Sequence, residues 1–201
     1  MITFSENHES SLVAFEAGRA LANFSNPQAE ALKWSYSLGA MPTQHVVIVG
    51  LGAGFHVAAL ADLDPQLKIT VVDNRPGLLP VFRSQFSELS ERVEVVIFQN
   101  AEDLFKTELY QEVLNQRCFV LSFQECWGEN STVFTNAFAH LTGRSVESVK
   151  SHFEDFGINI KAIYMQNKNM LSIKDVLPAI ESSHATENEK NVFRTLGELV
   201  K

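Results

Sequence analysis

Between residues 45 and 123 the chain alternates short apolar runs with segments of helical character. Each apolar run is short enough for one strand, and most are rich in β-branched residues: HVVIVG (45–50), KITVVD (68–73), VEVVIF (93–98) and RCFVLSF (117–123). A continuous apolar run such as the first is typical of a strand buried on both faces of a parallel sheet. The pattern therefore predicts strands and helices that take turns along the chain.

The segments between these runs predict three helices. The first starts within the glycines that follow residue 50 and ends near Asp62, the second covers about 77–89, and the third covers 101–114. A fifth strand is expected at INIKAIYM (158–165). We predict a doubly wound α/β fold with a mostly parallel, Rossmann-like sheet of strand order 3-2-1-4-5.

Two helices are expected before the first strand. Apolar residues recur at helical spacing over residues 9–24. In the next segment Asn26 is suited to cap a helix, Pro27 fits its first turn, and Gly39 follows its end. The sequence thus predicts an N-terminal helical pair.

The C-terminal part is also expected to be helical. Two helices are predicted between residues 131 and 156, separated by Gly143. Ser172 with Asp175, and Thr186 with Glu189, have the spacing of capping signals. Pro178 lies between these pairs and is expected to divide the segment into two short pieces.

The chain is expected to form a single domain over residues 1–201, because it contains no internal repeat, low-complexity tract or linker. Within it we predict a helical cap (1–40), a nucleotide-binding core (45–165) and C-terminal helices (166–201). A chain of this length buries one sizeable core, whereas a second full domain would have to be unusually small.

Composition narrows the classes of function. The 201 residues are 45% hydrophobic and 20% charged, and no apolar run approaches the length of a membrane helix. The first ten residues lack the features of a signal peptide, so a cytoplasmic location without membrane association is expected. The formal charge of -8 disfavours nucleic acid as a partner. Nothing in the sequence sets the oligomeric state.

Cysteine and histidine positions do not suggest a metal site. Cys118 and Cys126 are the two cysteines, and they are expected to be free thiols. No two histidines have the spacing that places a pair of ligands on one helix face. His152 lies close to two acidic residues, but a solvated helix face explains that cluster better than a metal does.

The most informative feature is a glycine-rich turn followed by an acidic residue. Gly50, Gly52 and Gly54 form a G-x-G-x-G turn after the first strand, and Asp73 ends the second strand. Such a turn lets a ligand approach the backbone at a helix N-terminus, and the acid can accept hydrogen bonds from ribose hydroxyls. Alternatively, the glycines only make a tight turn and Asp73 caps its loop. Phe55 replaces the third glycine of the dinucleotide pattern, which argues against NAD or FAD.

Residues 45–125 resemble class I S-adenosylmethionine-dependent methyltransferases. The resemblance rests on the glycine turn, on Asp73, and on "NAEDL" after the third strand, which is similar to the "gDAedl" segment of that family. It implies that S-adenosylmethionine is the cofactor and that Asn100 and Ala101 contact its adenine. The expected cofactor-binding residues are Gly50, Gly52, Gly54, His56, Asp73, Asn74, Asn100, Ala101 and Gln124.

A second resemblance covers residues 25–85. Asn26, Pro27 and Glu30, the run from Gly50 to His56, and Asp73 followed by Pro76 look like the N-terminal segment of the motility accessory factor family of flagellin glycosyltransferases. That family is related to hydroxymethylpterin pyrophosphokinases. The G-x-G-P-S motif of its catalytic domain is missing from this chain, so glycosyl or pyrophosphoryl transfer is not expected.

Candidates for catalysis are few, and the sequence names no catalytic residue. After the fourth strand, Glu125 could act as a general base, Gln124 could orient an acceptor, and Trp127 could wall a flat substrate. The alternative is that Trp127 packs beneath a helix and Glu125 faces water. Cys126 is expected to be inert rather than nucleophilic. His56, in the first turn of a helix, is expected to be neutral, either beside a ligand or packed in the core.

Two functions remain open at this level. One is a nucleoside-binding protein similar to S-adenosylmethionine-dependent methyltransferases that acts on a small molecule. Such an enzyme would need to do little more than position the acceptor in line with the methyl group, since the sulfonium is already activated. The alternative is a non-catalytic nucleotide-binding or interaction module related to the N-terminal part of a transferase.

Overall fold

The computed structural model describes residues 1–89, 91–115, 117–149 and 173–199. Contacts within the chain define two compact units, Met1–Gly143 and Arg144–Lys201. The single domain expected over residues 1–201 stays a prediction. The candidate site belongs entirely to the first unit.

The first unit is built on a parallel sheet whose strands are the predicted apolar runs. The described residues form four of its strands in the order β6-β5-β4-β7, and all neighbours are parallel. The mixed α/β class with a parallel sheet flanked by helices is therefore confirmed. The predicted fifth strand, 158–165, lies outside the described residues, so the full order 3-2-1-4-5 stays a prediction. The strands are β4 (His45–Val49), β5 (Lys68–Asp73), β6 (Val93–Ile97) and β7 (Phe119–Ser122).

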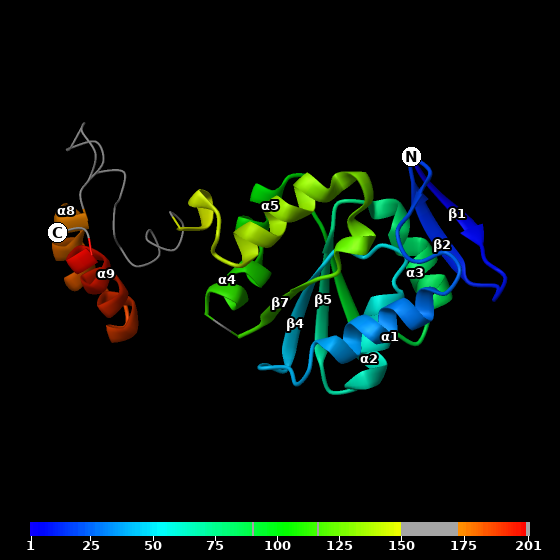
Figure 1. Ribbon diagram of the computed structural model, residues 1–201, viewed down its shortest axis with the longest axis horizontal. Coiled ribbons are helices and arrows are strands. Elements are labelled where there is room, and N and C mark those ends of the chain that lie inside the picture. The colour runs from blue at the N-terminus through cyan, green and yellow to red at the C-terminus, as the bar shows by residue number, and fades with distance from the viewer. Residues whose placement is uncertain (90, 116, 150–172, 200–201) are drawn as a thin grey trace. The chain divides into compact units, whose positions relative to one another are not determined.

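Alternation along the strands gives the sheet two covered faces. Val46, Ile48 and Val71 pack in one hydrophobic cluster with the helices α1, α2 and α3. Val47 and Val49 pack in a second cluster with the α4 and α5 side. Figure 1 shows α1 and α2 on one side of the strands and α4 and α5 on the other. The α-helices are α1 (Pro27–Ser37), α2 (Phe55–Leu63), α3 (Leu79–Gln85), α4 (Glu108–Leu114) and α5 (Ser131–Leu141).

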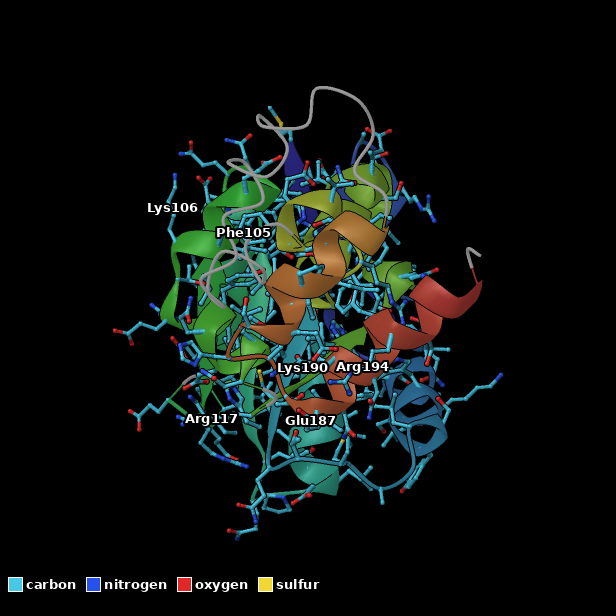
Figure 2. All side chains as sticks on the ribbon, turned by 90° about the vertical axis from the view of Figure 1, so that its left-hand side faces the viewer. Phe105, Lys106, Arg117, Glu187, Lys190 and Arg194 are labelled. Carbon is cyan, nitrogen blue, oxygen red and sulfur yellow. The ribbon has the colours of Figure 1, made fainter. Side chains whose placement is uncertain are left out.

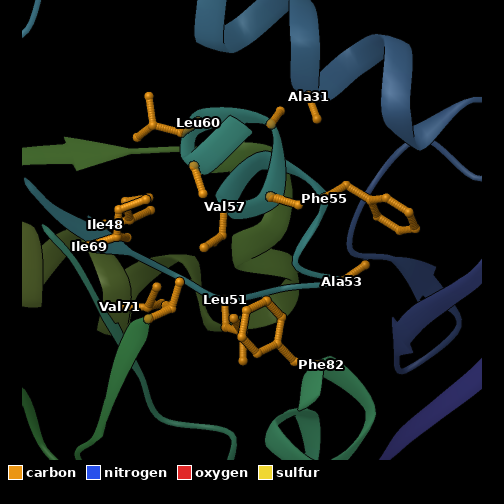
Figure 3. Close-up of a cluster of buried hydrophobic side chains, with 14 of the residues drawn as sticks. Ala31, Ile48, Leu51, Ala53, Phe55, Val57, Leu60, Ile69, Val71 and Phe82 are labelled. Carbon is orange, nitrogen blue, oxygen red and sulfur yellow. The ribbon is translucent and has the colours of Figure 1, made fainter. Parts of the chain in front are cut away.

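Helix α2 lies in the middle of the first cluster. Figure 3 shows Val57 and Leu60 of α2 near the sheet residues Ile48 and Ile69, with Ala31 of α1 above them. The small residues of α2 and Ala31 let α1 pack closely on it. Residues 27–37 form α1 as expected, because the Asn26 side chain accepts a hydrogen bond from Ala29 N at 2.9 Å.

The prediction of a helix over residues 9–24 is wrong, and the N-terminal part is therefore not a helical pair. The chain forms an antiparallel meander of β1 (Ile2–Glu6), β2 (Leu12–Glu16) and β3 (Arg19–Ala20). Its turns explain the difference. The Asn7 side chain accepts from the N–H groups of Glu9 and Ser11, and Gly18 has a φ of +83°. Both features favour turns over a continuous helix.

Three short 3₁₀ helices complete the unit. The helix predicted over residues 101–114 is divided in two, because Thr107 has an extended conformation and caps the N-terminus of α4. Helix α5 ends at Leu141, and Gly143 follows with a φ of +69°. Residues 150–156 of the next predicted helix lie outside the described residues. The 3₁₀ helices are η1 (Pro76–Leu78), η2 (Ala101–Lys106) and η3 (Gln124–Asn130).

The second unit contains α8 (Ile173–Glu181) and α9 (Glu187–Leu199). The expectation that Pro178 divides this segment is wrong: α8 continues past it, and Ser182 N bonds to Pro178 O at 3.2 Å. A proline at this position removes one hydrogen bond of a short helix without stopping the next turn.

The capping signal at Thr186 is confirmed, since Thr186 N donates to the Glu189 carboxylate at 2.8 Å. Figure 2 shows Glu187, Lys190 and Arg194 together on α9. Arg194 Nη2 donates to Glu181 of α8 at 2.6 Å and so links the two helices. No helix in the described parts of the chain combines the length and the apolar character that a membrane crossing requires.

Candidate functional site

The glycine-rich turn joins the carboxyl end of β4 to the N-terminus of α2, as the sequence predicts. Gly50 and Gly52 have φ angles of +102° and +51°, in the region that side chains rarely adopt. This is the edge of a parallel sheet at which ligands bind in open α/β folds. The turn has the backbone geometry expected of a ligand-binding turn. The residues that pack beside it determine whether a ligand has room there.

The space beside the two glycines is filled by the chain itself. A Cβ atom on Gly50 would lie 2.5 Å from Cys126 Sγ, and one on Gly52 would lie 2.4 Å from Cys126 Cβ. Leu21 O would be 3.0 Å from the same added atom on Gly52. The glycines therefore allow another group to come close to the backbone, as their pattern indicates. In this chain that group is η3.

Residues of η3 are packed against the turn. Cys126 and Trp127 are buried, and Trp127 Nε1 donates to Val49 O at 2.8 Å. The Cys126 thiol donates to Phe123 O at 2.9 Å. Trp127 also stacks on Phe134 of α5, with ring centroids 6.0 Å apart. The structure thus favours the packing role of Trp127 over that of a wall for a flat substrate.

Asp73 lies at the end of β5, where its carboxylate is completely buried and fully engaged. Leu51 N donates to Oδ2 at 2.6 Å. Arg75 donates three times, from its backbone N to Oδ1 at 2.8 Å, from Nε to Oδ1 at 2.9 Å, and from Nη2 to Oδ2 at 2.8 Å. Asp73 is 0% exposed. In this arrangement it offers no oxygen to a ribose.

Arg75 connects Asp73 to two other segments. Its Nη2 also donates to Cys126 O at 3.0 Å, and its guanidinium lies 4.7 Å from the centre of the Phe134 ring. Burial opposes the charge, but the bonds to Asp73 outweigh burial and raise the pKa of Arg75 above its usual value. The residue therefore stays a cation in the interior.

Glu16 of the N-terminal meander completes this network. Its Oε2 lies 3.7 Å from Arg75 Nη1 and accepts from Glu129 N at 3.1 Å, and its other oxygen accepts from Asn130. The meander thus holds η3 in place over the turn. Neither Glu16 nor Arg75 was among the predicted site residues. The nearest signal was the arginine two positions after Asp73.

His56 is a core residue rather than a group that faces solvent. Its Nε2 is 3.0 Å from Gly50 O and therefore carries the proton, since a carbonyl only accepts. The ring stacks on Phe123 with centroids 4.6 Å apart. Burial is the main cause that lowers the pKa of His56 to about 4, so the ring is neutral at pH 7.

The other predicted contacts are spread along the same edge. Asn100 is exposed and caps the N-terminus of η2, with its N–H donating to Asp103 at 2.9 Å, whereas Ala101 is buried. Gln124 is exposed at the start of η3. Asn74 is half-buried, and its Oδ1 has no hydrogen-bond partner among the described residues.

Cysteine chemistry is disfavoured at both thiols. Burial raises the pKa of Cys118 to about 11 and that of Cys126 well above its usual range. Both therefore stay protonated at neutral pH. No group of three metal-ligating side chains occurs in the described residues.

A second polar cluster lies at the opposite edge of the sheet. His45 Nδ1 is 2.9 Å from Glu112, and His45 Nε2 is 2.9 Å from the Thr70 hydroxyl. This order resembles a nucleophile, base and carboxylate. Thr70 is 0% exposed, however, so its hydroxyl cannot meet a substrate. Burial and the nearby Lys68 lower the pKa of His45.

Comparison with known proteins adds no identification. No protein-family model matches the chain, and no curated protein sequence matches it significantly. The two resemblances found in the sequence therefore stay predictions. On geometry, the residues at the glycine turn do not fit S-adenosylmethionine, because η3 fills the close approach and Arg75 takes up the carboxylate that a ribose would need.

Gly52→Ala tests whether Cys126 occupies the turn. The added methyl group would clash with Cys126, and the alanine would have to adopt a left-handed backbone conformation. We therefore expect the free energy of unfolding, measured in urea, to fall by about 3 kcal/mol. Gly39→Ala is the matched control, since Gly39 also has a positive φ of +68° but no atom lies within 4 Å of its added Cβ, so it should lose only about 1–2 kcal/mol through backbone strain. Equal stability of both variants would show that Cys126 does not fill this space.

His56→Gln tests the buried neutral histidine. Because its pKa is about 4 in the folded chain and 6.5 otherwise, the unfolded state takes up the proton first as the pH falls. The contribution to stability is complete above pH 6.5 and is lost towards pH 4, up to about 3 kcal/mol. Urea unfolding from pH 7 to 4.5 should therefore depend less on pH in His56→Gln. The exposed control His8→Gln should keep the parent slope, and a parent slope in His56→Gln would refute this account.

Proposed function

We propose that this chain is a non-catalytic, Rossmann-like interaction module whose nucleoside crevice is closed by its own residues. One observation carries the proposal: the Asp73 carboxylate, which would bind a ribose, is buried against Arg75 and Leu51 N. The fold keeps the backbone features of a nucleotide site but uses them for internal packing.

The energetic cost of opening this crevice supports the proposal. A group that approached Gly52 along its Cβ direction would have to displace Cys126 of η3. That movement would remove the Cys126 carbonyl from Arg75 and expose the buried Trp127. The hydrogen bonds that η3 makes to the charged groups of Arg75 and Glu16 would be lost, at about 1.5–3 kcal/mol each. Since each 1.4 kcal/mol is a factor of about ten, the affinity for a nucleoside would fall by at least about a hundredfold.

The alternative is an S-adenosylmethionine-dependent methyltransferase that acts on a small molecule. It is favoured by the G-x-G-x-G turn at the start of α2 and by the acid at the end of β5. It requires Arg75 to release Asp73 when the cofactor binds. An NAD-dependent enzyme is less consistent with the chain, because Phe55 stands where the third glycine is needed and is buried in the core.

Calorimetry on the unmodified chain separates these two functions. We expect no saturable heat with S-adenosylmethionine, S-adenosylhomocysteine or NAD at ligand concentrations up to about 1 mM, the affinity of a weak site. Micromolar binding of either sulfur nucleoside would contradict the proposal. The decisive result comes from the unmodified protein, so it does not depend on whether an Asp73 variant folds.

A further inference from the structure

The outer face of α1 and α2 exposes large apolar side chains. Leu32 and Tyr36 of α1 are 43% and 69% exposed, and Leu63 of α2 is 43% exposed. Leu32 and Tyr36 are one helical turn apart, so they share a side of α1. We call these three residues and the hollows that flank them the docking face. Tyr36 and Leu63 line the same hollow, so exposed apolar side chains of the two helices are neighbours. Apolar surface that gathers in this way marks sites of association.

The first hollow lies beside the N-terminal half of α1 and has a volume of about 410 Å³. Phe55 of α2 and Phe86 after α3 contact each other edge to face, 5.4 Å apart, and form its aromatic part. Leu32, Ala58 and Ala59 add an apolar wall. The hollow is large enough for one bulky apolar side chain and part of the chain that carries it.

The second hollow lies at the C-terminal ends of the same two helices and has a volume of about 350 Å³. Tyr36 and Met41 contribute from α1 and the segment after it, and Leu60, Leu63 and Leu67 contribute from α2 and the segment after it. Leu32 lines the first hollow and Tyr36 the second, so the two hollows are neighbours along α1. A ligand that fills both hollows must be long enough to lie along α1 and α2.

The charges of the docking face have one sign. Asp62 and Glu88 line the first hollow and Asp64 lines the second, whereas no lysine or arginine occurs among the described residues that line either one. A partner with lysine or arginine beside its apolar residues would complement this face. The formal charge of -8 on the chain makes a second copy a poor occupant.

Gln85 adds a directional group to the first hollow. Its Oε1 accepts from Leu12 N at 2.8 Å, which fixes the amide, and its buried Nε2 has no hydrogen-bond partner among the described residues. A buried donor of this kind favours a carbonyl oxygen. A peptide segment offers such a group together with apolar and basic side chains.

We propose that the docking face binds a basic amphipathic helix of a partner protein. Two apolar side chains of that helix enter the two hollows, and its lysine or arginine residues meet Asp62, Asp64 and Glu88. This is the helix-in-groove mode of peptide recognition. The inference deepens the proposed interaction role. It does not depend on the glycine turn, so nucleoside binding by the chain would overturn the proposed function alone.

The test uses fluorescence anisotropy of labelled model peptides with the full chain. The main probe is a leucine–lysine amphipathic helix of about five turns, and the matched probe has glutamate in place of every lysine. A leucine–lysine peptide of the same composition in scrambled order tests whether the helical face matters. We expect saturable binding of the ordered leucine–lysine helix, and binding about tenfold weaker or worse for the other two peptides.

Variants place the peptide on the docking face. Leu32→Lys and Leu63→Lys should each weaken binding about tenfold, since each removes an apolar contact and adds a like charge. Asp62→Asn combined with Glu88→Gln should weaken it and reduce its dependence on salt. Phe119→Lys is the control, because Phe119 is an exposed apolar residue of β7 that lines neither hollow, and it should bind like the parent.

Three results would overturn the proposal. They are no saturable binding of the leucine–lysine helix, equal binding of the glutamate peptide, and unchanged affinity in both leucine variants. Circular dichroism of each variant should match the parent, because Leu32 and Leu63 are partly exposed. Sedimentation of the free chain adds a fourth test: a dimer that Leu32→Lys dissociates would assign the face to a second copy instead.

Discussion

Asp73 and Arg75 are both removed from water at the carboxyl edge of the sheet, so the hydrogen bonds between them replace those that each side chain would make with water. A buried carboxylate without a partner is among the costliest groups in a folded protein. Here it receives four hydrogen bonds, one from Leu51 N and three from Arg75. Because Arg75 also holds the Cys126 carbonyl, the same interaction fixes η3 over the glycine turn. The closed state of the crevice follows from satisfying this one pair.

A glycine-rich turn requires that some group approach the backbone closely, but it does not specify that the group is a ligand. In nucleotide-binding domains a phosphate or a sugar uses the space. In this chain Cys126 and Leu21 use it. The surface that we propose for function therefore lies on the helices α1 and α2, where the exposed Leu32 and Leu63 each line one of two hollows.

Short sequence patterns predicted the strands and helices that depend on interactions between residues close together in the sequence. The parallel strands follow from apolar runs, and α1 follows from Asn26 and Pro27 at its start. The prediction for residues 9–24 is wrong because their apolar spacing also fits a helix. The turns at Asn7 and Gly18 favour strands instead. The chemistry at Asp73 could not be predicted, since its environment comes from segments far apart in sequence. Cys126 follows β7, and Glu16 belongs to the meander. Sequence spacing identified the acid but not its partner.

The most direct measurement is a double-mutant cycle on the buried pair, with Asp73→Asn, Arg75→Met and the double variant compared by urea unfolding. If the two side chains stabilise each other, each single substitution lowers the free energy of unfolding by about 3 kcal/mol. The double variant then loses less than the sum of the two, by about 2 kcal/mol or more. If Asp73 is instead held free for a ligand, the two effects add to within about 0.5 kcal/mol. Additivity would contradict the closed crevice on which this account rests.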